Sequence, residues 1–188
     1  ANQQYGYFAS DLLQQKLGSS GNNILLNELV AGYGNDLKID SLEVESLASF
    51  DEPLTAKYII RNETEAEDII YFSPVLGARL KENPFKSAER KYPVEMPFAI
   101  NELYTLSMEI PDGYTVDELP KSVNLMLNAK KEAVFEYTIS KSATHVSLNY
   151  ELELRKAVFL PAEYNLLREF YKGVVGKLDE QVVFKKKP

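Results

Sequence analysis

The stretch that decides the fold is residues 133–154, "AVFEYTISKSATHVSLNYELEL". Apolar and polar residues alternate through most of it, and a period of two is typical of a β-strand with one buried face. The alternation is interrupted at residues 140–143, "SKSA". We therefore expect two antiparallel strands joined by a turn, with the apolar residues of both strands on one face.

The same period recurs elsewhere in the chain. It predicts further strands, which fall at residues 42–44, 54–60, 69–72, 104–110, 123–127 and 181–184. "PDG" at residues 111–113 predicts a tight turn, because proline presets φ and glycine accepts a positive φ. Several short alternating strands favour a mainly β protein, an antiparallel two-sheet β-sandwich. An open antiparallel sheet with a helix on one face is the alternative.

Helical periodicity is expected at both ends of the chain. After Pro161, apolar residues spaced by three and four predict one C-terminal helix. Two short helices are expected at residues 9–17 and 24–31. We interpret residues 1–36 as a helical lead-in from a preceding domain and residues 37–188 as the β-sandwich domain. Because residue 1 is Ala rather than an initiator Met, the chain is interpreted as an excised part of a longer protein.

Composition excludes several classes of function. The 188 residues include no Cys, which excludes a disulfide framework and a cysteine nucleophile. The net charge of −7 disfavours nucleic-acid binding, which needs a basic face. No apolar run approaches the roughly 20 residues of a membrane-spanning helix, so no membrane span is expected.

Few residues suggest catalysis. His145 is the only histidine, and the period places it on the polar face of its strand, without a nucleophile or an orienting group beside it. Glu151 and Glu153 point the same way from one strand, as a pair of glycosidase carboxylates does, but no aromatic residue shares their face. A solvated sheet face explains all three residues, so no catalytic residue is expected.

Cofactor and metal signals are also weak. No glycine-rich phosphate loop is present, and the acidic residues at 63–68 lack the order of a calcium-binding EF-hand loop. We expect no cofactor and no metal site. The tyrosines at 58, 104, 137 and 150 lie at inward positions of their strands and are expected to pack in the core.

Residues 83–98, "NPFKSAERKYPVEMPF", form a long connection between two predicted strand groups. Prolines stiffen such a segment by fixing φ. Polar side chains can satisfy the backbone groups that a loop leaves unpaired. The residues that we single out for this structural loop are Asn83, Arg90, Tyr92 and Pro93. A binding loop is the alternative interpretation.

One set of motifs resembles a known family. It comprises "NPFKSAERKYPVEM", "YTLSMEIPDGYTVDELPKS", "KAVFLPAEYNLLREFYKGVV" and "EQVVFKKK", in this order within residues 83–187. Together they resemble the C-terminal domain of unknown function that follows a transglutaminase-like domain in multidomain proteins of Gram-negative bacteria. The resemblance implies a periplasmic or cell-surface parent protein. It carries over no catalytic residue, because the family's Cys-His-Asp set would lie in the preceding domain.

These observations lead to one functional hypothesis and two rivals. The first is a non-catalytic accessory domain of a larger cell-envelope protein, with a scaffolding or ligand-positioning role. Its expected partners are the preceding transglutaminase-like domain and a cell-envelope protein or glycan. The second is a free-standing carbohydrate- or peptide-binding β-sandwich. The third is a hydrolase that uses Glu151 and Glu153.

Overall fold

The computed structural model describes residues 2–4, 37–45, 54–62, 67–76, 80–97 and 99–188. The chain divides into two compact units, Ala1–Ala66 and Glu67–Pro188. The helices expected at residues 9–17 and 24–31 lie outside the described residues.

The first unit contains a three-stranded antiparallel sheet in the order β1-β3-β2. Its strands are β1 (Asn2–Gln4), β2 (Leu37–Glu45) and β3 (Leu54–Asn62). The expected domain boundary at residues 36/37 therefore differs from the boundary between the compact units, which falls at residues 66/67. Residues 2–4, within the expected helical lead-in, form strand β1 instead. They do so because their backbone pairs with β3, about fifty residues further along the chain, and local sequence does not reveal this partner.

The main layer of the second unit is a four-stranded antiparallel sheet in the order β6-β10-β9-β8. Its strands are β6 (Ile100–Glu109), β8 (Val123–Met126), β9 (Ala133–Lys141) and β10 (His145–Leu154). The hairpin predicted at residues 133–154 is confirmed as β9 and β10. Their inward residues, including Phe135 and Leu148, are fully buried.

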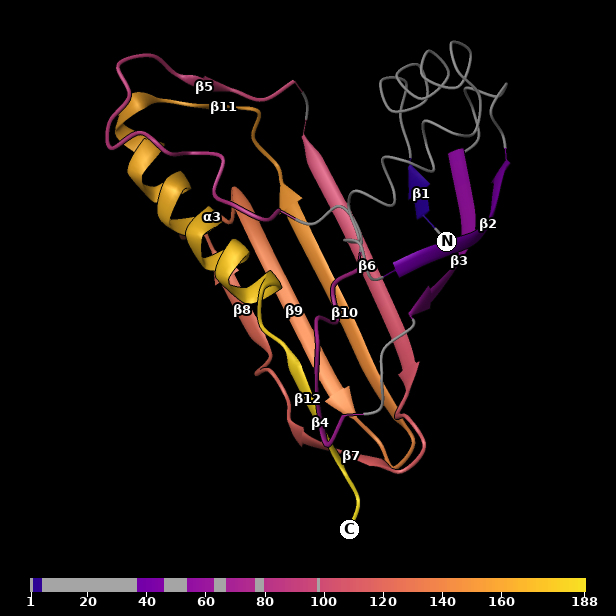
Figure 1. Ribbon diagram of the computed structural model, residues 1–188. Coiled ribbons are helices and arrows are strands. Elements are labelled where there is room, and N and C mark those ends of the chain that lie inside the picture. The colour runs from indigo at the N-terminus through magenta and orange to yellow at the C-terminus, as the bar shows by residue number, and fades with distance from the viewer. Residues whose placement is uncertain (1, 5–36, 46–53, 63–66, 77–79, 98) are drawn as a thin grey trace. The chain divides into compact units, whose positions relative to one another are not determined.

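A second layer covers one face of this sheet (Figure 1). It combines a three-stranded antiparallel sheet in the order β4-β12-β7 with the helix α3 (Tyr164–Leu178). The strands are β4 (Ile69–Phe72), β7 (Tyr114–Glu118) and β12 (Val182–Lys186). A short pair, β5 (Val94–Glu95) with β11 (Val158–Phe159), and the 3-10 turn η1 (Pro161–Glu163) complete the described elements.

The expectation of a mainly β protein with antiparallel sheets and one C-terminal helix is confirmed. Strand β7 was not expected. It follows the "PDG" turn, where Gly113 has the positive φ of 82° that the turn predicted. β7 exists because β12 pairs with it from nearly seventy residues further along the chain, with a register shift between Val183 and Phe184.

Helix α3 rests on the sheet through the apolar stripe that its spacing predicted. The buried apolar residues of the helix are Tyr164, Leu167, Phe170, Tyr171, Val174 and Leu178. The helix approaches β8 closely at Gly173, where a Cβ atom would lie only 2.9 Å from Cδ1 of Leu125. A larger residue at this position would therefore require the end of the Leu125 side chain to move.

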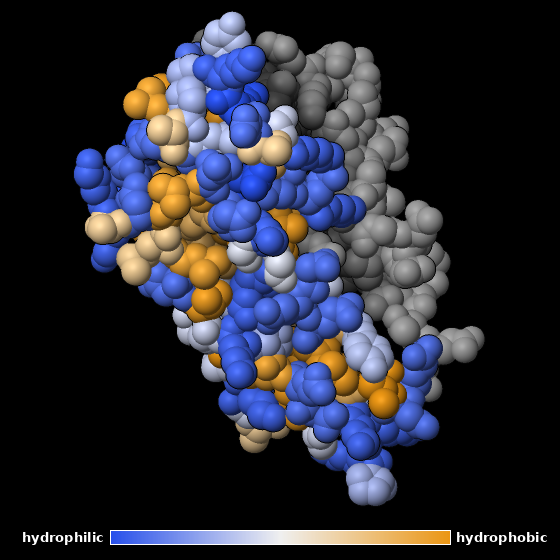
Figure 2. Space-filling view, turned by 90° about the vertical axis from the view of Figure 1, so that its left-hand side faces the viewer, coloured by the Kyte–Doolittle hydropathy of each residue, from blue (hydrophilic) through white to orange (hydrophobic). Residues whose placement is uncertain are grey.

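The opposite face of the four-stranded sheet is mostly polar, since Thr105, Glu136 and Asn149 are exposed there. On the side where α3 lies, apolar side chains are interrupted by hydrophilic ones rather than forming one continuous surface (Figure 2). Within the described part of the chain, no helix is long and apolar enough to cross a membrane.

The α3 stripe yields a prediction with an internal control. Leu167 is fully buried and its neighbour Leu166 is 52% exposed. Leu167→Ala should lower the free energy of unfolding by about 2–5 kcal/mol, because it leaves a cavity under the helix. Leu166→Ala should change it by less than about 0.5 kcal/mol. Urea denaturation of both variants measures the difference, and equal effects would contradict the packing of α3.

Candidate functional site

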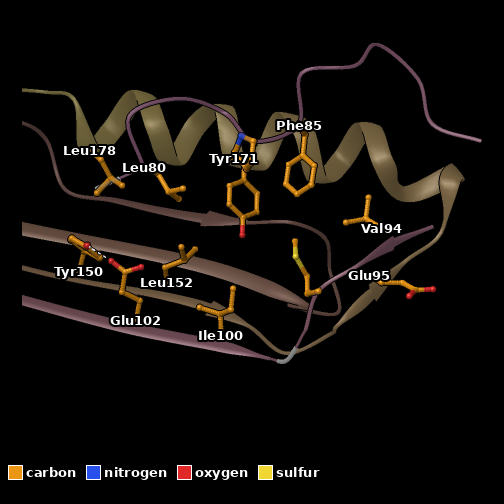
Figure 3. Close-up of a pocket in the computed structure, with 12 residues that line it drawn as sticks. Leu80, Phe85, Val94, Glu95, Ile100, Glu102, Tyr150, Leu152, Tyr171 and Leu178 are labelled. Atoms are coloured by element: carbon orange, nitrogen blue, oxygen red, sulfur yellow. Dashed lines mark hydrogen bonds between the residues drawn. The ribbon is translucent and has the colours of Figure 1, made fainter. Parts of the chain in front are cut away.

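A pocket of about 470 Å³ opens between α3, the connecting segment at residues 80–96, and strands β6 and β10 (Figure 3). Its lining residues are Leu80, Pro84, Phe85, Val94, Glu95, Met96, Ile100, Glu102, Tyr150, Leu152, Tyr171 and Leu178. Most of these side chains are apolar. A volume of this size and a largely apolar lining with a few polar groups are typical of small-molecule sites.

One polar group of the pocket is a tyrosine–carboxylate pair. Tyr150 is buried on β10, and its hydroxyl donates a hydrogen bond to Oε1 of Glu102 on the edge strand β6 at 2.5 Å. The ring of Tyr104 stacks on the Tyr150 ring at 5.1 Å between centroids. Burial, and then the negative charge of Glu102, raise the pKa of Tyr150 well above that of a free tyrosine. Tyr150 therefore stays protonated and donates to the carboxylate.

A second polar group is the hydroxyl of Tyr171. Its side chain descends from α3 into the pocket (Figure 3), and the residue is only 4% exposed. The hydroxyl has no hydrogen-bond partner among the residues that the structure describes. Burial, followed by the charge of Glu102, raises the pKa of Tyr171 to about 12. The pocket thus presents a neutral hydroxyl that can donate or accept one further hydrogen bond.

The connecting segment that forms one wall is fastened to α3. Asn83 donates from Nδ2 to the carbonyl of Arg168 at 2.8 Å and accepts from the backbone N–H of Phe85 at 2.9 Å. The Phe85 ring packs edge-on against Tyr171 at 5.0 Å between centroids. The segment therefore brings an aromatic wall of the pocket into contact with the helix that supplies the hydroxyl.

The carbonyls of this segment are bound by the helix rather than by the segment's own arginine. Nη1 of Arg168 donates to the carbonyls of Ser87 and Ala88 at 3.2 and 3.1 Å. The hydroxyl of Tyr164 donates to the same Ser87 carbonyl at 2.9 Å. Arg90, expected to satisfy backbone carbonyls, instead places its guanidinium over the Tyr164 ring, 5.9 Å from the centroid.

The remaining residues singled out in this segment lie at the surface. Tyr92 is 81% exposed and Pro93 is exposed. Val94 and Glu95 follow directly and form the short strand β5. Of the four residues that the sequence indicated, Asn83 makes contacts that fix the backbone, and Arg90 packs against the helix.

The three residues considered for catalysis lie away from the pocket. His145, Glu151 and Glu153 occupy the outward face of β10, and none of them lines the pocket. Nε2 of His145 is 3.8 Å from a carboxylate oxygen of Glu109. The guanidinium of Arg155 binds Glu153 at 2.7 Å and holds the pKa of this carboxyl below its usual value.

Sequence reasoning missed Glu102 and the role of Tyr171. A signal for Glu102 was present, because it continues the inward positions of Tyr104, Leu106 and Met108 along β6. A carboxylate at such a position breaks the apolar pattern of its strand face. Tyr171 was identified as part of the helix stripe, but only the folded chain shows that its hydroxyl meets the pocket.

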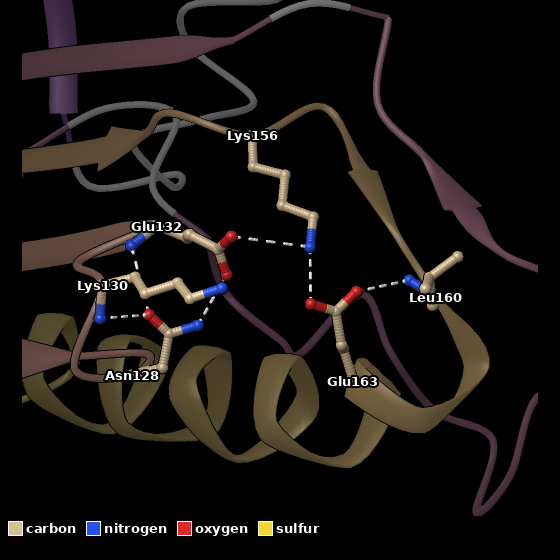
Figure 4. Close-up of polar contacts among 6 residues, drawn as sticks. All are labelled: Asn128, Lys130, Glu132, Lys156, Leu160 and Glu163. Carbon is tan, nitrogen blue, oxygen red and sulfur yellow. Dashed lines mark hydrogen bonds and ion pairs between the residues drawn. The ribbon is translucent and has the colours of Figure 1, made fainter.

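A separate polar network fixes the start of α3 (Figure 4). Nζ of Lys156 binds Glu163 at 2.5 Å and lies 3.7 Å from Glu132. Glu163 accepts the backbone N–H of Leu160 at 2.7 Å, which satisfies a donor at the start of the helical segment. The Lys156 ammonium, and next the Leu160 N–H, lower the pKa of Glu163. This network has a structural role.

The described residues contain no group of three or more His, Asp or Glu side chains that could hold a metal ion.

Comparison with known proteins identifies the family. Residues 68–184 match the model of DUF3858, described as a domain of unknown function with a solved structure. This match covers more than half of the chain, and the protein therefore belongs to this family. The expected resemblance to a domain of unknown function is thus confirmed.

One solved structure has a similar fold. It is a crystal structure of a protein from Parabacteroides distasonis that is described as a candidate protease, with 18% sequence identity and a TM-score of 0.50. The likeness covers 62% of this chain and 23% of the other, so the chain spans about a quarter of that protein's length. At this identity the likeness shows the fold alone. No curated protein matches the chain.

The fastening of the pocket wall to α3 yields a second prediction. Arg168→Ala removes the donors to Ser87 and Ala88. Hydrogen bonds from charged groups contribute on the order of 1–3 kcal/mol, so trypsin cleavage after Lys86 should accelerate at least about threefold. Lys172→Ala is the control, because Lys172 lies on the same helix with a 74% exposed side chain. A larger acceleration in Arg90→Ala than in Arg168→Ala would make Arg90 the anchor after all.

Burial of Tyr171 yields a third prediction, on pH. An unfolded tyrosine ionises near a pKa of about 10, whereas the pKa of folded Tyr171 is raised to about 12. Between these values the folded state keeps a proton that the unfolded state has lost, so stability falls as pH rises from 10 to 12. Tyr171→Phe should reduce this fall, measured as the change in urea midpoint between pH 9 and pH 11.5. Tyr92→Phe, which alters a ring that is 81% exposed, should not reduce it.

Proposed function

We propose that residues 67–188 form a non-catalytic accessory domain of a larger transglutaminase-like protein, and that the pocket positions a ligand for its neighbouring domain. The observation that carries this proposal is the composition of the pocket. Its polar lining residues are Glu95, Glu102, Tyr150 and Tyr171, and the carboxylate of Glu95 points away from the other side chains (Figure 3). No serine, threonine, histidine or lysine is among the described residues that line it.

Such a lining suits binding better than acyl transfer. Acyl transfer needs an activated nucleophile, a base within reach and a donor pair for the oxyanion. Tyr150 stays protonated by burial and by its bond to Glu102, and its raised pKa makes it a poor nucleophile at neutral pH. The apolar walls would instead shield a ligand from water while the polar groups set its orientation.

Two observations on architecture motivate the proposal of an accessory role. A similar fold makes up a minor part of a longer protein that is described as a candidate protease. The motifs within residues 83–187 resemble a domain that follows a transglutaminase-like domain in cell-envelope proteins of Gram-negative bacteria. We accordingly propose a periplasmic or cell-surface location, with the preceding domain and a cell-envelope protein or glycan as partners.

The fourth prediction tests this proposal on the chain and on its full-length parent. The purified 188-residue chain should show no turnover of amide or glutamine-donor substrates, whereas the parent should be active. In the parent, Met96→Trp should fill the pocket and raise KM at least about fivefold while kcat stays within about twofold, because positioning is lost and chemistry is not. Met126→Trp is the control, since Met126 is 53% exposed and lies outside the pocket.

Two results would contradict the accessory role. One is turnover by the purified chain that is abolished by Glu151→Gln or His145→Ala, which would instead support the hydrolase hypothesis. The other is a parent whose KM and kcat are unchanged by Met96→Trp although the variant remains folded.

A further inference from the structure

The pocket combines three properties that together restrict its ligand. Its walls are apolar, its charged lining residues are both acidic, and the hydroxyl of Tyr171 faces it without a protein partner among the described residues. The charged lining residues are Glu95 and Glu102, both exposed, and Glu102 directs its carboxylate toward Tyr150 whereas that of Glu95 points away from the other lining side chains (Figure 3). No basic residue is among the described residues that line the pocket. An anionic ligand would therefore enter a region of like charge, whereas a cation would be attracted.

The carboxylate of Glu102 is positioned to receive such a cation. Its Oε1 atom accepts the hydrogen bond from Tyr150, which orients the group (Figure 3). An ionised carboxylate accepts several hydrogen bonds, so capacity remains for a donor from a ligand. Hydrogen bonds between an ammonium and a carboxylate are stronger than those between neutral groups.

Tyr171 adds a second point of attachment. Its hydroxyl enters the pocket from the helix, opposite the strand that carries Glu102 (Figure 3). Only 4% of this residue is exposed, and its hydroxyl faces the space of the pocket, where a ligand can bind it in place of water. The apolar wall between these groups includes Ile100 and Leu152.

We propose that this pocket binds an amphiphilic primary amine: an apolar chain lies against the walls, and its ammonium group donates hydrogen bonds to Glu102 while Tyr171 supplies a further polar contact. This inference rests on the proposed function in one respect, because both take this pocket as the ligand site. It adds the chemical class of the ligand, which neither the family nor the similar structure provides.

The test compares three probes that share one apolar chain and differ in charge: hexylamine, hexanol and hexanoate. At neutral pH the amine is a cation and the carboxylate an anion. Binding to the 188-residue chain is measured by the shifts of backbone amide signals in NMR titrations. Hexylamine should bind at least about fivefold more tightly than hexanol, and hexanoate more weakly than either.

Variants assign this preference to residues. Glu102→Gln should bring the affinities for hexylamine and hexanol within about twofold of each other, because the carboxylate is lost and the shape is kept. Tyr171→Phe should weaken hexylamine binding. Glu151→Gln is the matched control, because it removes a carboxylate from the outward face of β10 and should leave the preference unchanged. Met96→Trp should abolish binding of all three probes, which locates them in the pocket.

Several outcomes would overturn the inference. They are hexanoate binding as tightly as hexylamine, an amine preference that persists in folded Glu102→Gln, or amide shifts that map outside the pocket. Urea denaturation of each variant confirms that it is folded. These measurements use no enzymatic activity. A parent whose KM responds to Met96→Trp while the chain shows no amine preference would sustain the proposed function and reject this inference alone.

Discussion

The burial of the apolar stripe of α3 in the common core holds the helix against the sheets of the second unit. Helix and strand β8 lie close together at Gly173, where a Cβ atom would lie 2.9 Å from Cδ1 of Leu125. The packing of the stripe from Tyr164 to Leu178 leaves Leu167 and Val174 fully buried. The position of α3 also determines how far the Tyr171 hydroxyl extends into the pocket. A helix held further from the sheet would loosen the core and withdraw this hydroxyl from the strands that carry Glu102 and Tyr150.

The second unit buries several tyrosines, and their hydroxyl groups differ in whether they form a hydrogen bond. Tyr150 offsets its burial through the bond to Glu102, whereas Tyr171 has no such bond to the described residues. Tyr137, also buried, keeps an unpaired hydroxyl, but the Lys177 ammonium lies over its ring at 5.1 Å from the centroid. The two unpaired tyrosines therefore differ in setting, because Tyr171 lines a pocket that a ligand can enter and Tyr137 does not.

The periodicity of apolar residues predicted the strands and the helix whose buried faces it marks. The hairpin at residues 133–154 and the stripe of α3 follow from alternation and from spacings of three and four, and both are confirmed. Strand β7 was missed because β12 supplies its pairing from a distant part of the sequence. Of the residues expected to satisfy backbone groups of the connecting segment, Asn83 does so and Arg90 does not. The sequence gives no indication that Arg168, eighty residues from Ala88, binds the Ala88 carbonyl. The pocket itself arises where helix, segment and sheet meet, so no local pattern reveals it.

The position of β12 has a consequence for how the domain forms in the cell. This strand lies between β4 and β7, and it pairs residues 182–186 with residues 69–72 near the start of the unit. A ribosome releases residues 69–72 long before it releases residues 182–186. Throughout that interval residues 69–72 and 114–118 lack the strand that pairs with both of them. The nascent domain therefore passes through a stage in which its second layer is incomplete, and this layer closes only when the last strand of the unit has been synthesised.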